Sequence, residues 1–296
     1  MTTDNKPYFF VPANQVKAIE KKKGTRSGRL QVTVKALTPL HFGAGTLGLV
    51  NDEFTHKLNR ENDKIVLPGS SFKGALRSVF EALSESCLLT KTDNGKCTCP
   101  ACSLFGFLGQ RGHLGFSSFS LAGQPEMDFL RLPQLRGPNI VDEKQRKFYK
   151  HSDQYIRISN HYKNKPLNSA LFECLPVNSQ LQGIITYQDI TSDQLGALLF
   201  SLGLGWDAPL HHKLGYAKPA YLGSVHLNIK PLDSLHSLIK RDSLSADELT
   251  ESAKEYYEKH NSAINESVET IRKMWAFDEI RSDWHWKEDA NGSLTY

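Results

Sequence analysis

The sequence predicts an α+β protein, and three patterns of residues support this prediction. Residues 29–36 alternate apolar and polar side chains, as half-buried strands do, and residues 181–187 also look like a strand. Residues 72–83 repeat their apolar side chains at helical spacing, and residues 192–202 form a shorter apolar run with a cap at its start. Taken in order, the predicted elements are strand, helix, strand, insertion, strand, helix, loop and strand. This is the order of a ferredoxin-like, or RRM-like, core with large insertions.

Length and composition indicate a folded protein. The chain has 296 residues, of which 39% are hydrophobic, enough for one large domain or two small ones. No apolar run approaches the roughly 20 residues that span a bilayer, and Met1 to Asn14 lacks the apolar core of a signal peptide. We therefore expect a soluble cytoplasmic protein with no membrane partner.

Charge is distributed unevenly along the chain. Residues 240–296 contain 8 Lys+Arg against 13 Asp+Glu, which leaves 28 against 19 in residues 1–239 and a net charge of +9 there. A basic body of this kind suits a polyanionic partner, although many domains that bind no polyanion are as basic. The acidic tail indicates a separate role.

The first third of the sequence predicts a basic lead over residues 1–28, then a strand that begins at Arg29. A loop rich in Gly and His follows at residues 38–45, and a polar stretch continues to Lys64. Residues 65–77 then change from a strand pattern to a helix pattern. Ser70 or Ser71 can cap the first N–H groups of this helix, which we expect to end near the first cysteine.

Four of the five cysteines lie within sixteen residues of one another, at Cys87, Cys97, Cys99 and Cys102. In a chain without an export signal this grouping favours metal binding over disulfides. Cys99 and Cys102 have zinc-knuckle spacing, and Zn²⁺ requires four thiolate or imidazole ligands in a tetrahedron. With Cys97 in the set, Cys87 or His113 could complete it. We predict structural Zn²⁺ in an insertion over residues 87–113, with free thiols as the alternative.

A second predicted insertion covers residues 124–168. Residues 112–121 alternate like a strand, but the periodicity is lost afterwards, and long insertions without regular structure are often functional. Between Arg131 and Lys165 there are nine Lys+Arg, three acids and several interleaved aromatic and His residues. Basic groups neutralise phosphates and aromatic rings stack on bases, so this mixture is typical of a single-strand binder. A solvated loop with a few packing aromatics is the alternative.

The remaining sequence completes the predicted order. Two strands, at residues 169–176 and 181–187, are joined by a polar turn, and the apolar helix over residues 192–202 follows. A Gly-rich loop with two histidines then leads to a closing strand near residues 223–229. Residues 233–296 form an acidic helical extension, because Ser245 and Glu248 make a capping box before one or two amphipathic helices. We expect these helices to provide a packing or partner surface.

Isolated acids and histidines remain ambiguous at this level. Asp52, in the polar stretch, is a solvated surface charge in most proteins of this composition. His41, His211 and His212 have glycines nearby. Each could contact a phosphate, act as an acid or base, or fill a turn. Their positions in the sequence do not decide between these roles.

Two longer motifs resemble a known family. Residues 40–43, Leu-His-Phe-Gly, are followed by Leu-Pro-Gly-Ser-Ser-Phe-Lys-Gly-Ala-Leu-Arg at residues 67–77. Cys-Pro-Ala-Cys-Ser-Leu-Phe-Gly at residues 99–106 precedes Gly-His-Leu-Gly-Phe at residues 112–116, and Phe-Glu-Cys-Leu-Pro-Val-Asn-Ser stands at residues 172–179. This series resembles the RAMP superfamily over residues 30–225, and it is most similar to the repeated backbone subunit of type III CRISPR effector complexes.

The resemblance implies that an RRM-like domain over residues 29–232 binds a crRNA guide along a filament, with residues 124–168 as a thumb. It also implies target RNA and the other type III effector subunits as partners. By this resemblance Ser70, Ser71, Lys73 and Arg77 would contact guide phosphates, helped by the helix N-terminus. The other RNA-binding candidates are His41, Tyr155, Arg157, Tyr162, His211 and Lys213.

Some members of this family also cleave the target RNA with an aspartate between the first strand and the Pro-Gly-Ser-Ser motif. Asp52 is the nearest candidate, although a strict register would place Asn51 there. The implied reaction is attack of a 2′-hydroxyl on the adjacent phosphate, assisted by Asp52 and a divalent ion such as Mg²⁺. Three alternatives stay open: a scaffold without catalysis, a guide-processing endoribonuclease that uses His41 or His211, and an unrelated RNA-binding module that contains zinc.

Overall fold

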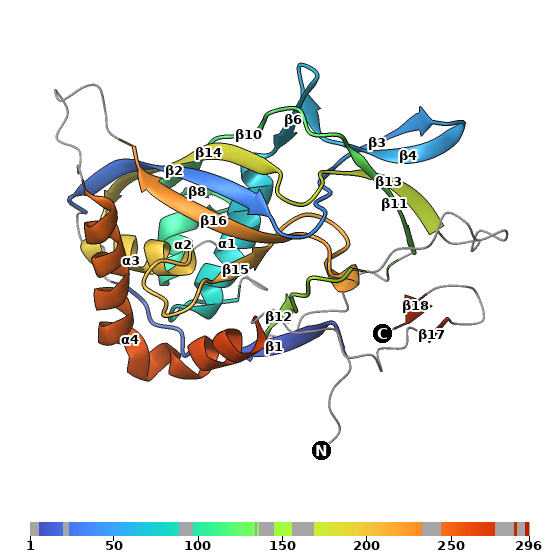
Figure 1. Ribbon diagram of the computed structural model, residues 1–296. Coiled ribbons are helices and arrows are strands. Elements are labelled where there is room, and N and C mark those ends of the chain that lie inside the picture. Colours follow the sequence, from blue (N-terminus) through green and yellow to red (C-terminus); the bar gives the residue numbers. More distant parts are fainter. Residues whose placement is uncertain are drawn as a thin grey trace.

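A computed structural model of the protein describes residues 6–19, 24–88, 97–133, 135, 145–155, 169–232, 244–275, 287–288 and 294–295. These residues form a mixed α+β fold, as the sequence predicts. Figure 1 shows one large curled sheet with helices against it, a second sheet that projects from the body, and a long helix along one side. None of the helices in these ranges is long and apolar enough to cross a membrane.

The large sheet has eight strands, and every pairing in it is antiparallel. Its central strand β2 (Arg26–Ala36) directs Leu30, Val32 and Val34 into the core and leaves the alternate side chains outside. The predicted alternation is therefore confirmed at this strand. The order of strands is β15 (His211–Lys213), β16 (Ser224–Pro231), β2, β14 (Gln180–Ile190), β10 (Phe119–Ala122), β6 (Lys64–Leu67) and β5 (Arg60–Glu61).

One strand predicted as continuous is divided in two. β9 (Leu114–Phe116) and β10 both pair with β14, and Ser117 and Ser118 lie between them. The Ser117 hydroxyl accepts a hydrogen bond of 2.8 Å from the Ile184 N–H, and the Ser117 N–H donates to the Ile184 carbonyl oxygen. A side chain thus replaces part of the backbone ladder, so pairing with β14 continues across the break.

Helices contribute much of the core beneath the large sheet. The helix α1 (Gly69–Ala82) contributes Phe72, Leu76 and Phe80, and α3 (Ser192–Ser201) contributes Leu198 and Leu199. Between them in sequence lies the short helix α2 (Pro100–Phe105), followed by the small hairpin of β7 (Gly106–Phe107) and β8 (Gln110–Arg111). The predicted serine cap of α1 is wrong, because Pro68 is the N-cap and makes no side-chain cap bond.

A second sheet joins the predicted strand at residues 169–176 to a hairpin that forms where the sequence predicts a polar loop. Strand β3 (Gly43–Val50) pairs with β4 (Glu53–Leu58), β4 pairs with β13 (Ser169–Cys174), and β13 pairs with β11 (Asp128–Pro133). Asn51 and Asp52 make the turn of the first hairpin with φ values of 49° and 60°. Both values are left-handed, as a two-residue turn of type I′ requires, and Asn and Asp tolerate this conformation.

The stretch over residues 124–168, predicted to lack regular structure, contains two strands. One is β11, and the other is β12 (Gln145–Tyr149), which pairs with β1 (Tyr8–Pro12) from the basic lead. These strands obtain their hydrogen bonds from distant parts of the chain, so local periodicity gave no signal of them. Arg157 and Tyr162, two predicted RNA contacts, lie outside the described residues.

The predicted tail helix is a single helix, α4 (Ala246–Met274), and its capping box of Ser245 and Glu248 is confirmed. One face of α4 is part of the main core, and its acidic side chains are exposed on the other face. The core residues of this face are Leu249, Ala253, Tyr256, Ile264, Val268 and Ile271. The short strands β17 (Lys287–Glu288) and β18 (Leu294–Thr295) pair with each other near the C-terminus.

Candidate metal centre and RNA-contact residues

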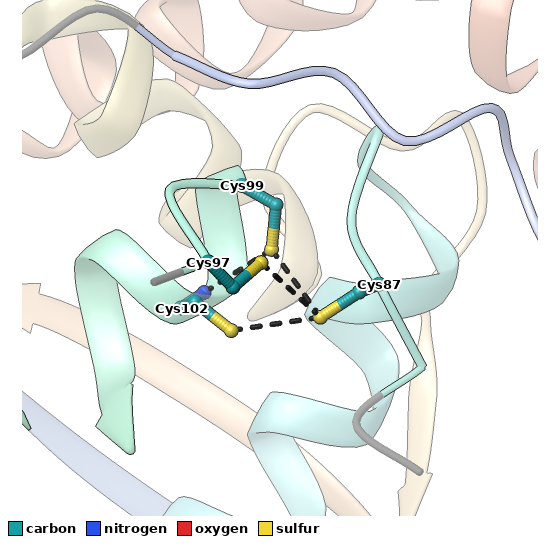
Figure 2. Close-up of side chains that lie close together, drawn as sticks. All are labelled: Cys87, Cys97, Cys99 and Cys102. Atoms are coloured by element: carbon teal, nitrogen blue, oxygen red, sulfur yellow. Dashed lines mark hydrogen bonds between the residues drawn. The ribbon is translucent and has the colours of Figure 1, made fainter. Parts of the chain in front are cut away.

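The four clustered cysteines come together between the end of α1 and the start of α2. Figure 2 shows their sulfur atoms pointing toward one another, with Cys87 on the segment after α1 and the other three at the start of α2. The Sγ of Cys87 lies 3.8 Å from that of Cys97, and 3.5 Å from those of Cys99 and Cys102. All four sulfur atoms lie within 4.8 Å of one another.

These distances fit a tetrahedral metal site. A Zn–S bond of about 2.3 Å places neighbouring sulfur atoms of a tetrahedron about 3.8 Å apart, close to the separations found. A disulfide requires about 2.05 Å, and none of the four cysteines forms one. His113 is not in the group, and its Nδ1 lies 2.9 Å from the Gln188 carbonyl oxygen. The arrangement is therefore compatible with structural zinc held by four thiolates.

Local structure explains why these thiols converge. Cys99 is the N-cap of α2, and its Sγ accepts a hydrogen bond of 3.5 Å from the Cys102 N–H, while Pro100 is the first helical residue. Hydrogen bonds from Cys102 lower the pKa of Cys99, whereas hydrogen bonding to Cys87 raises the pKa of Cys102. Four adjacent thiols cannot all ionise without a cation, and a bound metal would supply that charge.

Arg77 lies at the boundary between this cluster and α1. Its guanidinium donates to Glu81 Oε1 at 2.8 Å, to the Gly106 carbonyl oxygen at 2.5 Å and to Cys102 Sγ at 3.5 Å. The Glu81 side chain is buried and also forms an ion pair with Arg146 of β12. A guide phosphate at Arg77 would have to compete with these partners.

The N-terminus of α1 is packed closely but carries exposed serines. A Cβ on Gly69 would lie 2.5 Å from the Ser117 carbonyl oxygen, so only glycine fits against the break between β9 and β10. Ser70 and Ser71 are exposed at the second and third helical positions. Lys73 stands two residues after Ser71, and partial burial lowers its pKa, with a contribution from Arg77.

The family follows from a comparison with known proteins. A family model described as the RAMP superfamily matches residues 33–216, more than half of the chain. The chain belongs to the RAMP superfamily. This membership indicates a CRISPR-associated, RNA-binding role. A search of the curated proteins finds no match.

Lys213, the last residue of β15, lies within the residues that match the RAMP superfamily and is buried. Its Nζ donates to the carbonyl oxygens of Tyr221 and Leu222, both at 3.1 Å, and burial lowers the pKa of Lys213 well below its usual range. A Cβ on Gly215 would lie 2.1 Å from the His41 carbonyl oxygen, so this glycine allows the loop after β15 to approach the chain after β2. Lys213 therefore stabilises the loop between β15 and β16 through hydrogen bonds to its backbone, and its ammonium group is not exposed to a ligand.

His41 is buried in the same part of this RAMP domain. Its Nδ1 lies 2.7 Å from the Glu173 carbonyl oxygen, and burial lowers its pKa. Its ring contacts Phe172 and Tyr216 edge-on. Phe172 and Tyr216 stack at 5.0 Å between ring centroids, and 42% of Tyr216 is exposed. Tyr155 is partly buried against the cluster that contains Phe172.

The two histidines of β15 point to opposite sides. His212 is buried, its Nε2 lies 2.9 Å from the Ser201 carbonyl oxygen, and burial lowers its pKa to about 4. His211 is partly buried beside His226, with ring centroids 5.7 Å apart. Burial, and to a smaller extent repulsion from His226, lowers the pKa of His211 to about 4. Both rings are therefore neutral at pH 7.

Asp52 lies alone at the tip of the β3–β4 hairpin. It is exposed, and among the described residues the only group of side chains arranged to hold a metal is the cysteine cluster. Its neighbour Glu53 forms an ion pair with Arg131 of β11. A divalent ion at Asp52 would need ligands from RNA or from another chain.

The sequence interpretation missed the network of Arg77, Glu81 and Arg146. A signal was available for its first half, because Arg77 and Glu81 stand four residues apart on a predicted helix. No local signal indicates Arg146, which is 65 residues away from Glu81 in the sequence and forms an ion pair with it from β12.

Proposed function

We propose that this chain is a guide-binding backbone subunit of a type III CRISPR effector complex, and that the N-terminus of α1 contacts the guide backbone. The observation that carries this proposal is the exposed Ser70 and Ser71 in the first turn of a 14-residue helix, within the residues that match the RAMP superfamily. Neither hydroxyl caps the helix, so both are available to a ligand.

The chemistry of this helix terminus suits a phosphate. The first N–H groups of a helix have no partner within the helix, and the helix dipole favours negative charge there. Two hydroxyl groups and the Lys73 ammonium group add donors and a positive charge within the first turns. Because such contacts reach only the sugar-phosphate backbone, they position an RNA without reading its sequence.

The order of elements supports the proposed ferredoxin-like core for residues 29–232. Strands β16, β2, β14 and β10 are adjacent in that order, and α1 and α3 pack on the same face of this sheet. A βαββαβ chain with the strand order 4-1-3-2 has this arrangement. The segments at 87–113 and 124–168 would then be the zinc-knuckle and thumb insertions, and residues 233–296 the helical extension.

Zinc has a structural role in this proposal. Cys87, Cys97, Cys99 and Cys102 would hold Zn²⁺ and so fix the end of α1 against the start of α2. Four protein ligands leave no open position on zinc, so the ion would brace the fold and take no part in a reaction.

Target RNA cleavage is a second candidate function, and the position of Asp52 favours it. The carboxylate is exposed at the tip of a hairpin that projects from the body, where an RNA bound to neighbouring subunits could reach it (Figure 1). Substitution Asp52→Asn in an assembled complex with guide RNA should abolish cutting at this position and leave target binding unchanged. If the Asp52→Asn complex still cut at this position, the chain would have only the scaffold role.

The guide-processing alternative receives less support. His41 would have to act as the acid or base, but its ring is buried and its Nδ1 already lies 2.7 Å from a carbonyl oxygen. His211 is partly buried against His226, and its low pKa keeps it neutral.

The main proposal is tested by RNA binding and its salt dependence. A labelled single-stranded RNA should bind the purified chain, and the logarithm of the affinity should fall linearly with the logarithm of salt concentration. Lys73→Glu should weaken binding and reduce the slope by about one phosphate contact, whereas Lys254→Glu, on the exposed face of α4, should do neither. Absence of RNA binding, alone and with the other effector subunits, would refute the proposal.

A further inference from the structure

A second surface of the chain combines aromatic rings with positive charge. The β1–β12 ribbon consists of Tyr8–Pro12 and Gln145–Tyr149, which pair antiparallel. Successive side chains of each strand point to opposite faces, so the ribbon has two faces. Tyr8 lies opposite Tyr149, and Phe10 lies opposite Lys147, so these four side chains share one face. The exposed fraction of Phe10 is 43%, which is high for a large apolar side chain.

The opposite face of the ribbon is fixed to the core. Phe9, Val11 and Phe148 are buried there, and the Phe148 ring meets the Trp275 ring edge-on at 5.3 Å. The Trp275 indole N–H also donates to the Tyr149 carbonyl oxygen at 3.1 Å. The outer rings therefore stand on a rigid base, and little conformational entropy would be lost when a ligand packs against them.

Lysine side chains lie over the rings of the outer face. The Nζ of Lys147 is 3.7 Å from the ring centroid of Tyr8 and 5.6 Å from that of Tyr149, and the Nζ of Lys6 is 5.7 Å from that of Tyr8. Residues 6–12 and 145–150 contain four basic residues and no acid. Partial burial and the charge of Lys6 lower the pKa of Lys147, so a bound anion would relieve the repulsion between these cations.

We infer that the outer face of the β1–β12 ribbon is a second contact site for single-stranded RNA, in which bases stack on Phe10 and Tyr8 and phosphates lie against Lys6 and Lys147. Aromatic faces beside ammonium groups match the alternation of bases and phosphates along one strand. An acidic peptide would satisfy the lysines, but its carboxylate side chains have no aromatic ring that could stack on Phe10 and Tyr8.

This inference rests on the proposed RNA binding but uses a different surface. The β1 strand precedes the residues that match the RAMP superfamily, and Ser70, Ser71 and Lys73 belong to another element. The two surfaces can therefore be tested separately, by variants of α1 and variants of the ribbon.

The experiment uses the full chain and two probes of equal length, a fluorescein-labelled oligouridine of about 15 nucleotides and an abasic sugar-phosphate oligomer. The double substitution Tyr8→Ala and Phe10→Ala should weaken oligouridine binding about ten-fold, because stacking on both rings is lost, and leave abasic binding unchanged. Lys147→Ala should weaken binding of both probes. The control is Leu108→Ala, an apolar residue that is 95% exposed on the β7–β8 turn and should change neither.

Two outcomes would overturn the inference while the proposed function stands. The double variant could bind oligouridine as tightly as the wild type while Lys73→Glu weakens it, or it could lose equal affinity for both probes. If the wild type bound neither probe, the proposed function and the inference would fail together. A second test uses the wild type, so it does not depend on whether a variant folds. An oligomer that contains 4-thiouridine should photocross-link to residues 8–10 or 147–149. Cross-linking only to other residues would contradict the site.

Discussion

The two ends of α1 differ in how their polar groups are used. At the C-terminal end, Arg77 and Glu81 are tied to each other, to Arg146 and to the cysteine cluster, and little of their side chains meets solvent. At the N-terminal end, Ser70 and Ser71 are exposed and cap nothing. Buried charges need partners within the protein, whereas exposed donors can be left for a ligand. One helix thus joins a structural brace to a candidate binding site.

The largest expected effect on stability comes from substitution in the cysteine cluster. Cys102→Ser should remove one metal ligand and lower the free energy of unfolding by on the order of 4 kcal/mol, because metal binding and folding are coupled. Zinc content by atomic absorption and thermal unfolding with and without a chelator would measure this. Cys174→Ser, at the buried cysteine outside the cluster, should leave the zinc content unchanged. A zinc-free wild-type protein would refute the metal centre.

Arg77→Ala should have the next largest effect, about 3 kcal/mol of unfolding free energy, because the buried Glu81 loses one of its two ion-pair partners. It should also speed the release of zinc to a chelator, since the guanidinium no longer donates to Cys102. Lys73→Ala, one turn earlier on α1, is the matched control and should alter neither quantity. Equal zinc release from both variants would mean that Arg77 does not support the cluster.

Two glycines in the N-terminal half of α1 are expected to respond oppositely to substitution by alanine. Gly69→Ala should destabilise the protein by about 2 kcal/mol, because the new Cβ meets backbone oxygen atoms of Phe116 and Ser117. Gly74→Ala should stabilise it by about 1 kcal/mol, because nothing lies within 4 Å of that Cβ and alanine favours the helix. Urea unfolding compares the two, and changes of the same sign would contradict the packing of the N-terminus.

The smallest effect on stability belongs to the serines. The double substitution Ser70→Ala and Ser71→Ala should change the unfolding free energy by less than about 0.5 kcal/mol, since neither hydroxyl caps α1. The same change should weaken RNA binding about ten-fold through the loss of two hydrogen bonds. Fluorescence anisotropy measures the affinity. A loss of stability without a loss of affinity would reverse the distinction between the two ends.

Local sequence patterns predicted several elements correctly. The alternation of β2 and the capping box of α4 depend on neighbouring residues, and both are confirmed. The polar stretch before Lys64 was predicted wrongly as a loop, because the exposed β3–β4 hairpin lacks the alternation of a half-buried strand. Its turn at Asn51 and Asp52 was the signal available.

The sequence by itself grouped Cys97, Cys99 and Cys102, because they stand within six residues and need only a short helix to converge, but it left Cys87 or His113 as the fourth ligand, and the tertiary structure brought Cys87 to the group. Only the tertiary structure decided that Arg77 and Lys213 face partners inside the protein, that His41 is buried, and that residues 8–12 join residues 145–149 in one ribbon. Such outcomes depend on hydrogen bonds and packing between residues far apart in the chain, and local patterns do not encode them.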